Sequence, residues 1–230
     1  MKVEERHEVS FSDGKVFQYA VPTVPLFLAS IRHLPNVIRG EDCLNASVDY
    51  LICETARKWD NHDVPKHLSG LSFVSSWGKP LGFRRGHLLT LREDFQGFFA
   101  TVAVDEFGEE ILDEAARNVV EEECNGVYST TVTLSSGRRV KFRELGVQEA
   151  IQTTRTKVAT LNSWAANFTR QLHQVRLSLQ EVDGVEYVQS SKFDSWPLTL
   201  KETFELNFAW ADAYGGISIS EKPKSTSGTA

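Results

Sequence analysis

Residue types that bind metals gather in one part of the sequence, in and after a predicted helix. They are Cys53, Asp60, His62, Asp63 and His67. Zinc would need about four such ligands converging tetrahedrally. Neither the C-x-x-C nor the H-x-x-x-H spacing occurs around these residues. We therefore expect no metal site and interpret the side chains as solvated loop residues. A metal-dependent enzyme or regulator that uses the 53–67 loop is the alternative.

Motifs for nucleophilic catalysis and for phosphate binding do not occur in the sequence. There is no G-x-S-x-G elbow, no G-x-x-x-x-G-K-[ST] loop and no G-x-G-x-x-G turn. The glutamates at 121–123 are consecutive, so on a helix they would point about 100 degrees apart, which is typical of a solvated acidic end. Three cysteines are too few for a disulfide framework, and none has an activating context. We expect no catalytic residues, no cofactor and no enzymatic activity.

Charge and hydropathy point away from nucleic acids and membranes. The formal net charge is -6 and the pI is about 5.6, whereas phosphate neutralisation needs a clustered positive excess. Two small basic groups, at 84–87 and 138–141, are interpreted as ordinary surface charge. No stretch approaches the roughly 18 apolar residues of a membrane span. The amino terminus, MKVEERHEVS, is charged where a signal peptide is apolar. We therefore expect a protein that is made in the cytoplasm.

Two segments of the chain have a sequence pattern that predicts the same small β-hairpin. EVSFSDGKVFQYA at 8–20 and TVTLSSGRRVKFREL at 131–145 each place short alternating runs on either side of a glycine turn. Helical periodicity follows the first hairpin and also the second. The unit of hairpin and helix at 8–34 and 131–160 predicts two related modules, each with a strand edge and a helix. Repetition for structural reasons alone is the alternative.

Periodicity also predicts the elements between the hairpins. Apolar residues recur at helical spacing over 26–34 and 41–59. The stretch 60–107 lacks a sustained period, and we predict strands at 88–91 and 98–104 joined by long loops. An acidic helix is predicted over 109–124, ending at an Asn-Gly pair.

The most periodic segment follows the second hairpin. Apolar residues alternate at spacings of three and four over about 30 residues, interrupted by one polar position, Thr154. Such a helix would span about 45 Å and would need an extended partner. Asn162 and Ser163 invite a local bend, so continuity over 148–181 is left open. The predicted interface consists of this seam and the adjacent tryptophan: Ile151, Val158, Leu161, Trp164, Ala165, Phe168, Leu172, Val175 and Leu179.

The last helix begins with a recognisable signal. Thr199 and Glu202 form a capping-box pair, in which each side chain satisfies the free backbone amide of the other residue. The polar tail SEKPKSTSGTA has the composition of a disordered terminus. If the tail is ordered, we expect another chain to hold it.

The carboxyl-terminal half contains short motifs in a fixed order. They read VTLSSGRRVKFRELGVQEA, LSLQEVDGVEYV and FDSWPLTLKETFELNF, with a helical segment after the first, and cover about residues 127–212. This order resembles small tail proteins of tailed bacteriophages, a group that includes tail assembly chaperones and baseplate or hub components. In that group a strand, an S-G-R turn and a second strand precede helices, a Val-Asp-Gly turn and a final helix. The resemblance implies a non-enzymatic role.

We therefore predict an α+β protein of two modules, each with a β-hairpin followed by helices, the second with a long amphipathic helix. The modules cover residues 1–126 and 127–216, and a polar tail covers 217–230. The expected function is a structural component of a phage tail, in or near the baseplate, that binds other tail proteins or a second copy through the long helix. A tail assembly chaperone that leaves before the virion matures is the alternative. The expected location is the virion tail, assembled in the host cytoplasm.

Overall fold

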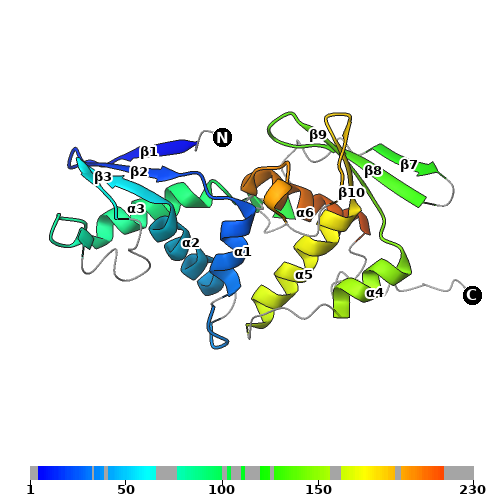
Figure 1. Ribbon diagram of the computed structural model, residues 1–230, viewed down its shortest axis with the longest axis horizontal. Coiled ribbons are helices and arrows are strands. Elements are labelled where there is room, and N and C mark those ends of the chain that lie inside the picture. The colour runs from blue at the N-terminus through cyan, green and yellow to red at the C-terminus, as the bar shows by residue number, and fades with distance from the viewer. Residues whose placement is uncertain are drawn as a thin grey trace, which may run out of the picture.

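Helices and antiparallel sheets build the chain, as the α+β prediction requires. The computed structural model describes residues 5–32, 34–38, 41–65, 77–99, 103–104, 110–111, 120–124, 127–155, 162–189 and 193–214. In Figure 1 the two larger sheets lie along the upper side of the molecule and most helices lie below them.

The first sheet has the strand order β1-β2-β3-β4, and every neighbouring pair is antiparallel. Two helices lie between β2 and β3 in the sequence, and a third follows β4. The elements are β1 (Arg6–Ser10), β2 (Val16–Ala20), α1 (Val24–Arg32), α2 (Glu41–Thr55), β3 (Ala56–Trp59), β4 (His62–Asp63) and α3 (Arg85–Gln96).

The second sheet has the order β11-β10-β9-β8-β7 and is also antiparallel. Its elements are β7 (Val120–Cys124), β8 (Val127–Thr133), β9 (Arg139–Arg143), α4 (Val147–Arg155), α5 (Ser163–Ser178), β10 (Leu179–Val182), β11 (Val185–Glu186), the short 3-10 helix η3 (Phe193–Ser195) and α6 (Leu200–Tyr214). A separate pair, β5 (Ala103–Val104) and β6 (Glu110–Ile111), lies between the two sheets in the sequence.

The two halves have the same topology: a hairpin, two helices, a second hairpin and a third helix. We call residues 6–96 the first repeat and residues 127–214 the second repeat. From β1 to β4 each element has its counterpart between β8 and β11 at a constant separation along the chain. The structure thus confirms two modules that each contain a β-hairpin followed by helices.

Turn geometry repeats as closely as the topology. Gly14 and Gly137 occupy the same turn position with φ of 82° and 84°, in the left-handed region that glycine adopts without strain. Asp60 and Asp183 each have φ of 53° in the turn between the third and fourth strands. Short polar side chains tolerate this conformation better than other non-glycine residues.

Each repeat also contains an irregularity where its second helix runs directly into a strand. In the first repeat Ala56 and Lys58 pair with consecutive residues of β2, and in the second repeat Leu179 and Glu181 pair with consecutive residues of β9. One residue is left out of the register at the same place in both sheets, as in a β-bulge. This shared irregularity supports a common fold for the two halves more strongly than the strand order alone.

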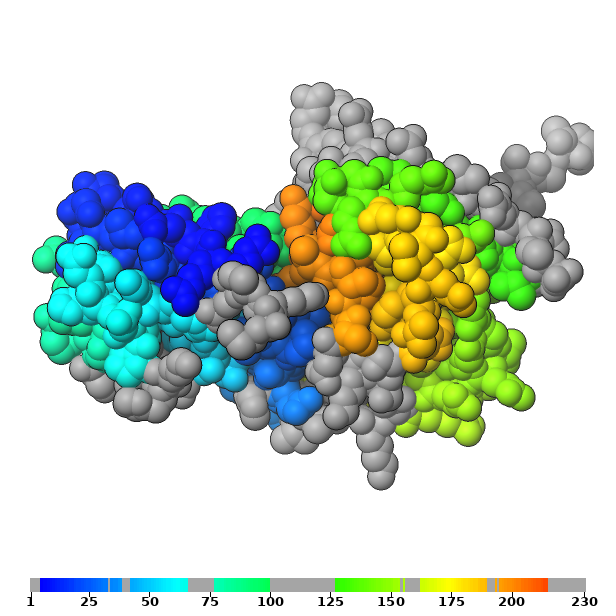
Figure 2. Space-filling view, turned by 45° about the horizontal axis from the view of Figure 1, so that its top comes forward, coloured from blue at the N-terminus to red at the C-terminus, as the bar shows by residue number. Residues whose placement is uncertain are grey.

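One hydrophobic cluster contains residues of both repeats. Phe27 of α1 lies 5.6 Å from the ring of Phe168 in α5 and 5.2 Å from the ring of Phe204 in α6. A second, smaller cluster fills the space between the second sheet and α5 and α6. Figure 2 shows the first repeat, blue to cyan, next to the orange surface of the second. The predicted boundary at residue 126 stays a prediction, but the packing of the core continues across it.

Four predicted elements have the wrong type or length. Of the strand predicted at 98–104, residues 98 and 99 form a turn after α3, and β5 covers Ala103–Val104. The residues predicted as a strand at 88–91 belong to α3, because His87, Leu91 and Phe95 are buried at a spacing of four. The predicted acidic helix at 109–124 contains strands β6 and β7 instead, and β7 pairs with β8 along its whole length. The helix predicted over 41–59 ends at Thr55, and its last four residues form β3.

The predicted long helix is not continuous. α4 ends at Arg155 and α5 begins at Ser163, with Asn162 in an extended conformation at φ -76° and ψ 120°. Its side chain accepts a hydrogen bond from the Ala165 N–H at 3.1 Å, which caps the new helix. α4 lies against α5, and Gln174 Nε2 donates to Thr153 Oγ1 at 3.2 Å. The segment 156–161 and the tail 217–230 lie outside the described residues.

Candidate functional site

The predicted interface seam is mostly core. Ala165, Leu172 and Val175 have no exposed surface, and Leu179 is 1% exposed and starts a strand. Trp164 stacks on Phe168 with ring centroids 5.4 Å apart, and both pack against the larger core cluster. Ala165, Leu172, Val175 and Leu179 are therefore occupied inside the chain, whereas Trp164 and Phe168 are only partly buried, and their role in an interface stays a prediction. The periodicity of the four buried residues arose from packing against the chain's own sheet and helices.

Ile151 is the most exposed of the described seam residues. Ile151 on α4 is 45% exposed, and its role in an interface stays a prediction. Val158 and Leu161 lie outside the described residues.

Four exposed apolar residues lie on α4 and at the start of β8. Val147 and Ile151 are one helical turn apart on α4 and are 77% and 45% exposed. Val127 and Tyr128 begin β8 and are 41% and 48% exposed. The Tyr128 carbonyl accepts a hydrogen bond from the Glu144 N–H, three residues before Val147. Because Val127 and Tyr128 are consecutive on a strand, their side chains point to opposite faces of the sheet. We call Val147 and Ile151 the α4 patch.

The position that corresponds to Val147 is buried in the first repeat. Val24 is the counterpart of Val147, yet only 2% of it is exposed. α1 packs against α2 of its own repeat and also against α5, α6 and η3 of the second repeat. In Figure 1, α1 lies at the centre of the molecule, whereas α4 lies toward its outer end. The same position of the repeat is therefore covered in one copy and exposed in the other.

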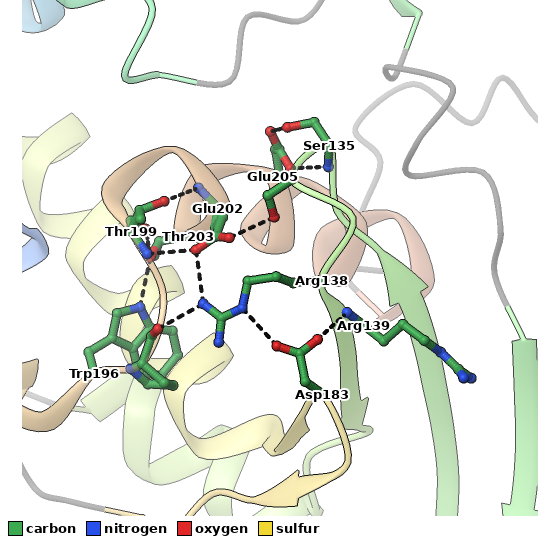
Figure 3. A network of polar contacts seen from close by, with 11 residues as sticks. Ser135, Arg138, Arg139, Asp183, Trp196, Thr199, Glu202, Thr203 and Glu205 are labelled. Atoms are coloured by element: carbon green, nitrogen blue, oxygen red, sulfur yellow. Dashed lines mark hydrogen bonds and ion pairs between the residues drawn. The ribbon is translucent and has the colours of Figure 1, made fainter.

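A network of polar contacts holds the tip of the β8–β9 hairpin (Figure 3). Arg138 donates from Nε to Asp183 Oδ2 at 2.9 Å and from Nη1 to the Pro197 carbonyl at 3.0 Å. Its Nη1 also lies 3.3 Å from Glu202 Oε2. We call Arg138, Asp183, Glu202 and Ser136 the tip clamp. One guanidinium thus joins the hairpin, the β10–β11 turn and the start of α6.

Glu202 is the buried member of the clamp, with 4% of its surface exposed. It accepts hydrogen bonds from the Ser136 hydroxyl at 2.7 Å and from the Thr199 N–H at 2.8 Å. Its own N–H donates to Thr199 Oγ1 at 3.2 Å, which confirms the predicted capping box. Burial opposes ionisation, but these hydrogen bonds and the charge of Arg138 outweigh it and lower the pKa of Glu202.

The first repeat contains a clamp of the same design with different residues. Lys15 takes the place of Arg138 and donates to the Leu81 carbonyl at 3.0 Å. His87 takes the place of Glu202: its Nδ1 accepts from the Arg84 N–H at 3.0 Å, and its Nε2 lies 3.1 Å from Asp13 Oδ2. In both repeats the hairpin tip is tied to the third residue of the third helix. Each described clamp residue is paired internally, which is typical of a structural role rather than a reactive site.

The candidate metal residues are not brought together where the structure describes them. Cys53 is buried in α2 at 6% exposure, whereas His62 and Asp63 are exposed on β4. Asp63 Oδ1 lies 3.8 Å from Lys58 Nζ, and His67 lies outside the described residues. Within the described ranges no group of three or more His, Cys, Asp or Glu side chains is placed to hold a metal ion.

A groove of about 720 Å³ lies between the two repeats. Pro22 and Pro25 line one side of it, and Phe193 and Trp196 line the other. Arg57 also borders the groove, where its Nη1 donates to the carbonyls of residues 54, 55 and 56 at 3.0–3.2 Å. At least one nitrogen of the guanidinium is therefore hydrogen-bonded to the end of α2.

Sequence reasoning missed most of these surface features. The clamp left a partial signal, because the capping box and the basic group at 138–141 were both visible. The α4 patch left a partial signal, because Ile151 was the first residue of the predicted interface seam, whereas Val147 was not singled out. No helix in the described part of the chain is long and apolar enough to cross a membrane. Comparisons of the chain with protein-family models, curated proteins and solved structures gave no match.

Proposed function

We propose that this protein is a non-enzymatic structural component of a bacteriophage tail, in or near the baseplate, which acts through contacts with other tail proteins. The proposal starts from the resemblance of the motifs at 127–212 to phage tail proteins. The internal repeat supports the proposal further, because the first half of the chain has the same succession of hairpins and helices as the second half. The SDGK turn at 12–15 occupies the place of the SSGR turn at 135–138.

The observation that carries the proposal is the difference between Val24 and Val147. Structural repeats bury apolar surface by packing on their neighbours, and a terminal repeat without a cap leaves such surface exposed. Val24 is buried on a helix that packs on the neighbouring repeat, whereas Val147 remains 77% exposed. An exposed apolar side chain in a position that the fold elsewhere buries favours a contact with another protein.

The covered copy indicates what kind of surface fits the α4 patch. α1 packs against α5 and α6, and the rings of Phe168 and Phe204 on these helices contact Phe27 of α1. We expect the partner to be a neighbouring tail protein that presents a similar pair of helices with large apolar side chains. The corresponding surface of this chain is less suitable, because Asn45 and Leu89 stand where the second repeat has Phe168 and Phe204.

Replacement of the patch in the phage that encodes the chain tests the proposal. Val147→Asp combined with Ile151→Asp should leave the protein folded, because both side chains are exposed, but should stop it from joining tails. Gln148→Asp, an exposed position on the same helix, is the matched control and should assemble normally. Electron microscopy of the particles and circular dichroism of the purified variants provide the two measurements. Normal tails that contain the double variant would contradict the proposal.

The same experiment separates a tail component from a tail assembly chaperone. A component stays in the finished particle, so mass spectrometry of purified virions should detect the chain. A chaperone would be required for tail formation but would be missing from the virions.

A further inference from the structure

The outer edge of β1 offers backbone groups for a further strand. Glu5, His7 and Val9 face β2, as the hydrogen bond from the Val21 N–H to the Glu5 carbonyl and the strand register show. The alternate residues Arg6, Glu8 and Ser10 therefore direct their N–H and C=O groups away from β2. Among the described residues, no strand pairs with this side of β1.

The second repeat shows that this edge of the fold accepts a strand. β8 is the counterpart of β1, and β7 pairs with it in antiparallel register from Val120 opposite Thr131 to Cys124 opposite Val127. Ser129 and Thr131 of β8 correspond to Arg6 and Glu8 of β1. In the second repeat β7 pairs with this edge of β8. In the first repeat the same edge, on β1, is the border of the described sheet.

The charges on β1 select the strand that would fit there. Arg6 and Glu8 are exposed on one face of the sheet, and His7 lies on the other face near Tyr19 and Phe98. If two β1 strands pair antiparallel with His7 on the axis, Arg6 of each copy stands opposite Glu8 of the other. Opposite charges in such cross-strand pairs are stabilising and like charges are destabilising. The neighbouring registers place Glu8 against Glu8 or Arg6 against Arg6.

We propose that the occupant is a second copy of this chain, which pairs through β1 about a twofold axis and joins the two four-stranded sheets into one. Twofold dimers are the commonest symmetric assemblies, and their interfaces must be self-complementary. The sequence Arg6-His7-Glu8 meets that condition. This interface is independent of the α4 patch and does not rest on the proposed role in a phage tail.

Sedimentation equilibrium over a range of protein concentrations tests the proposal. The unmodified chain should be in a monomer–dimer equilibrium. Glu8→Pro should give a monomer throughout, because proline removes an N–H that points outward and is tolerated on edge strands. Glu8→Ala is the matched control: it also loses the hydrogen bond from Gln18 Nε2 to the carboxylate and the two Arg6–Glu8 pairs, but it keeps the N–H and should still dimerise, with a dissociation constant raised only a few-fold. Circular dichroism confirms that each variant folds.

A charge exchange tests the register even if the proline variant fails to fold. Arg6→Glu should raise the dissociation constant by about tenfold, because it places like charges opposite each other twice. Arg6→Glu combined with Glu8→Arg should restore most of the affinity. A chain that stays monomeric at the highest concentration, or a dimer whose dissociation constant none of these changes affects, would overturn the proposal.

Discussion

Arg138 links three parts of the second repeat through one side chain. Its guanidinium contacts Asp183, Pro197 and Glu202, which lie 45–64 residues further along the chain than Arg138. Because Glu202 is buried, the pair is more sensitive to substitution than an exposed salt bridge would be. The first repeat achieves the same tie with Lys15 and His87, so the position of the clamp is repeated but its chemistry is not. This difference explains why comparison of the two halves by residue identity does not reveal the clamp.

Loss of the Glu202 charge should destabilise the protein in a pH-dependent way. The pKa of Glu202 is lowered in the folded state, so the carboxylate contributes stability that is present above its unfolded pKa, near 4.5, and is lost as the pH falls through the lower folded value. Glu202→Gln should therefore lower the free energy of unfolding by about 1–3 kcal/mol at pH 7. The difference from the unmodified chain should shrink below about pH 4.

Urea denaturation at several pH values measures this effect. Glu205→Gln is the control on the same helix, where the carboxylate bonds to the exposed Ser135, and it should cost less. An equal loss of stability from Glu202→Gln at pH 3 and pH 7 would show that the charge of Glu202 is not what stabilises the clamp.

Helices and strands were predictable to different degrees. The two hairpins, α1 and α6 follow from turn glycines, apolar periodicity and the capping box, all of which are local signals. The strand β7 and the helix α3 were assigned wrongly, because the glutamates at 121–123 suit a helix as well as an edge strand, and 88–91 is too short a window to separate the two periods. The break at Asn162 was suspected from its polarity, but the contacts that cause it come from distant residues.

Asn162 should be the residue on which the break between α4 and α5 depends. Its side chain is 1% exposed, caps α5, and donates from Nδ2 to the carbonyls of Pro35 at 2.7 Å and Ile38 at 3.0 Å. Asn162→Ala removes the cap and leaves these carbonyls without that donor, so the free energy of unfolding should fall by about 2–4 kcal/mol. Thermal or urea denaturation measures the change. Asn167→Ala, on the exposed side of the same helix, should change stability by less than about 0.5 kcal/mol, and an equal cost at both positions would refute the assignment.

The whole molecule consists of two copies of one unit that share part of their core. Few counterparts are identical: Val9 and Val132, Gly14 and Gly137, and Asp60 and Asp183 are among them. Two turn positions and the buried faces of the strands suffice to keep the fold, because cores tolerate changes that keep volume and pattern. The sequence therefore showed the repeated hairpin but not the full repeat, and it could not show that the contact between the repeats covers α1 and leaves α4 exposed.

α4 and α5 are two helices that lie against each other rather than one continuous rod, and Ala165, Leu172, Val175 and Leu179 are buried within the chain. Spin labels on unnatural ketone residues at Gln152 and Gln174 test this directly by pulsed electron resonance, and they leave the native cysteines untouched. Because Thr153 contacts Gln174, the distance between the labels should lie below about 20 Å. A continuous helix would place them about 33 Å apart, at about 1.5 Å per residue, and that result would contradict the account.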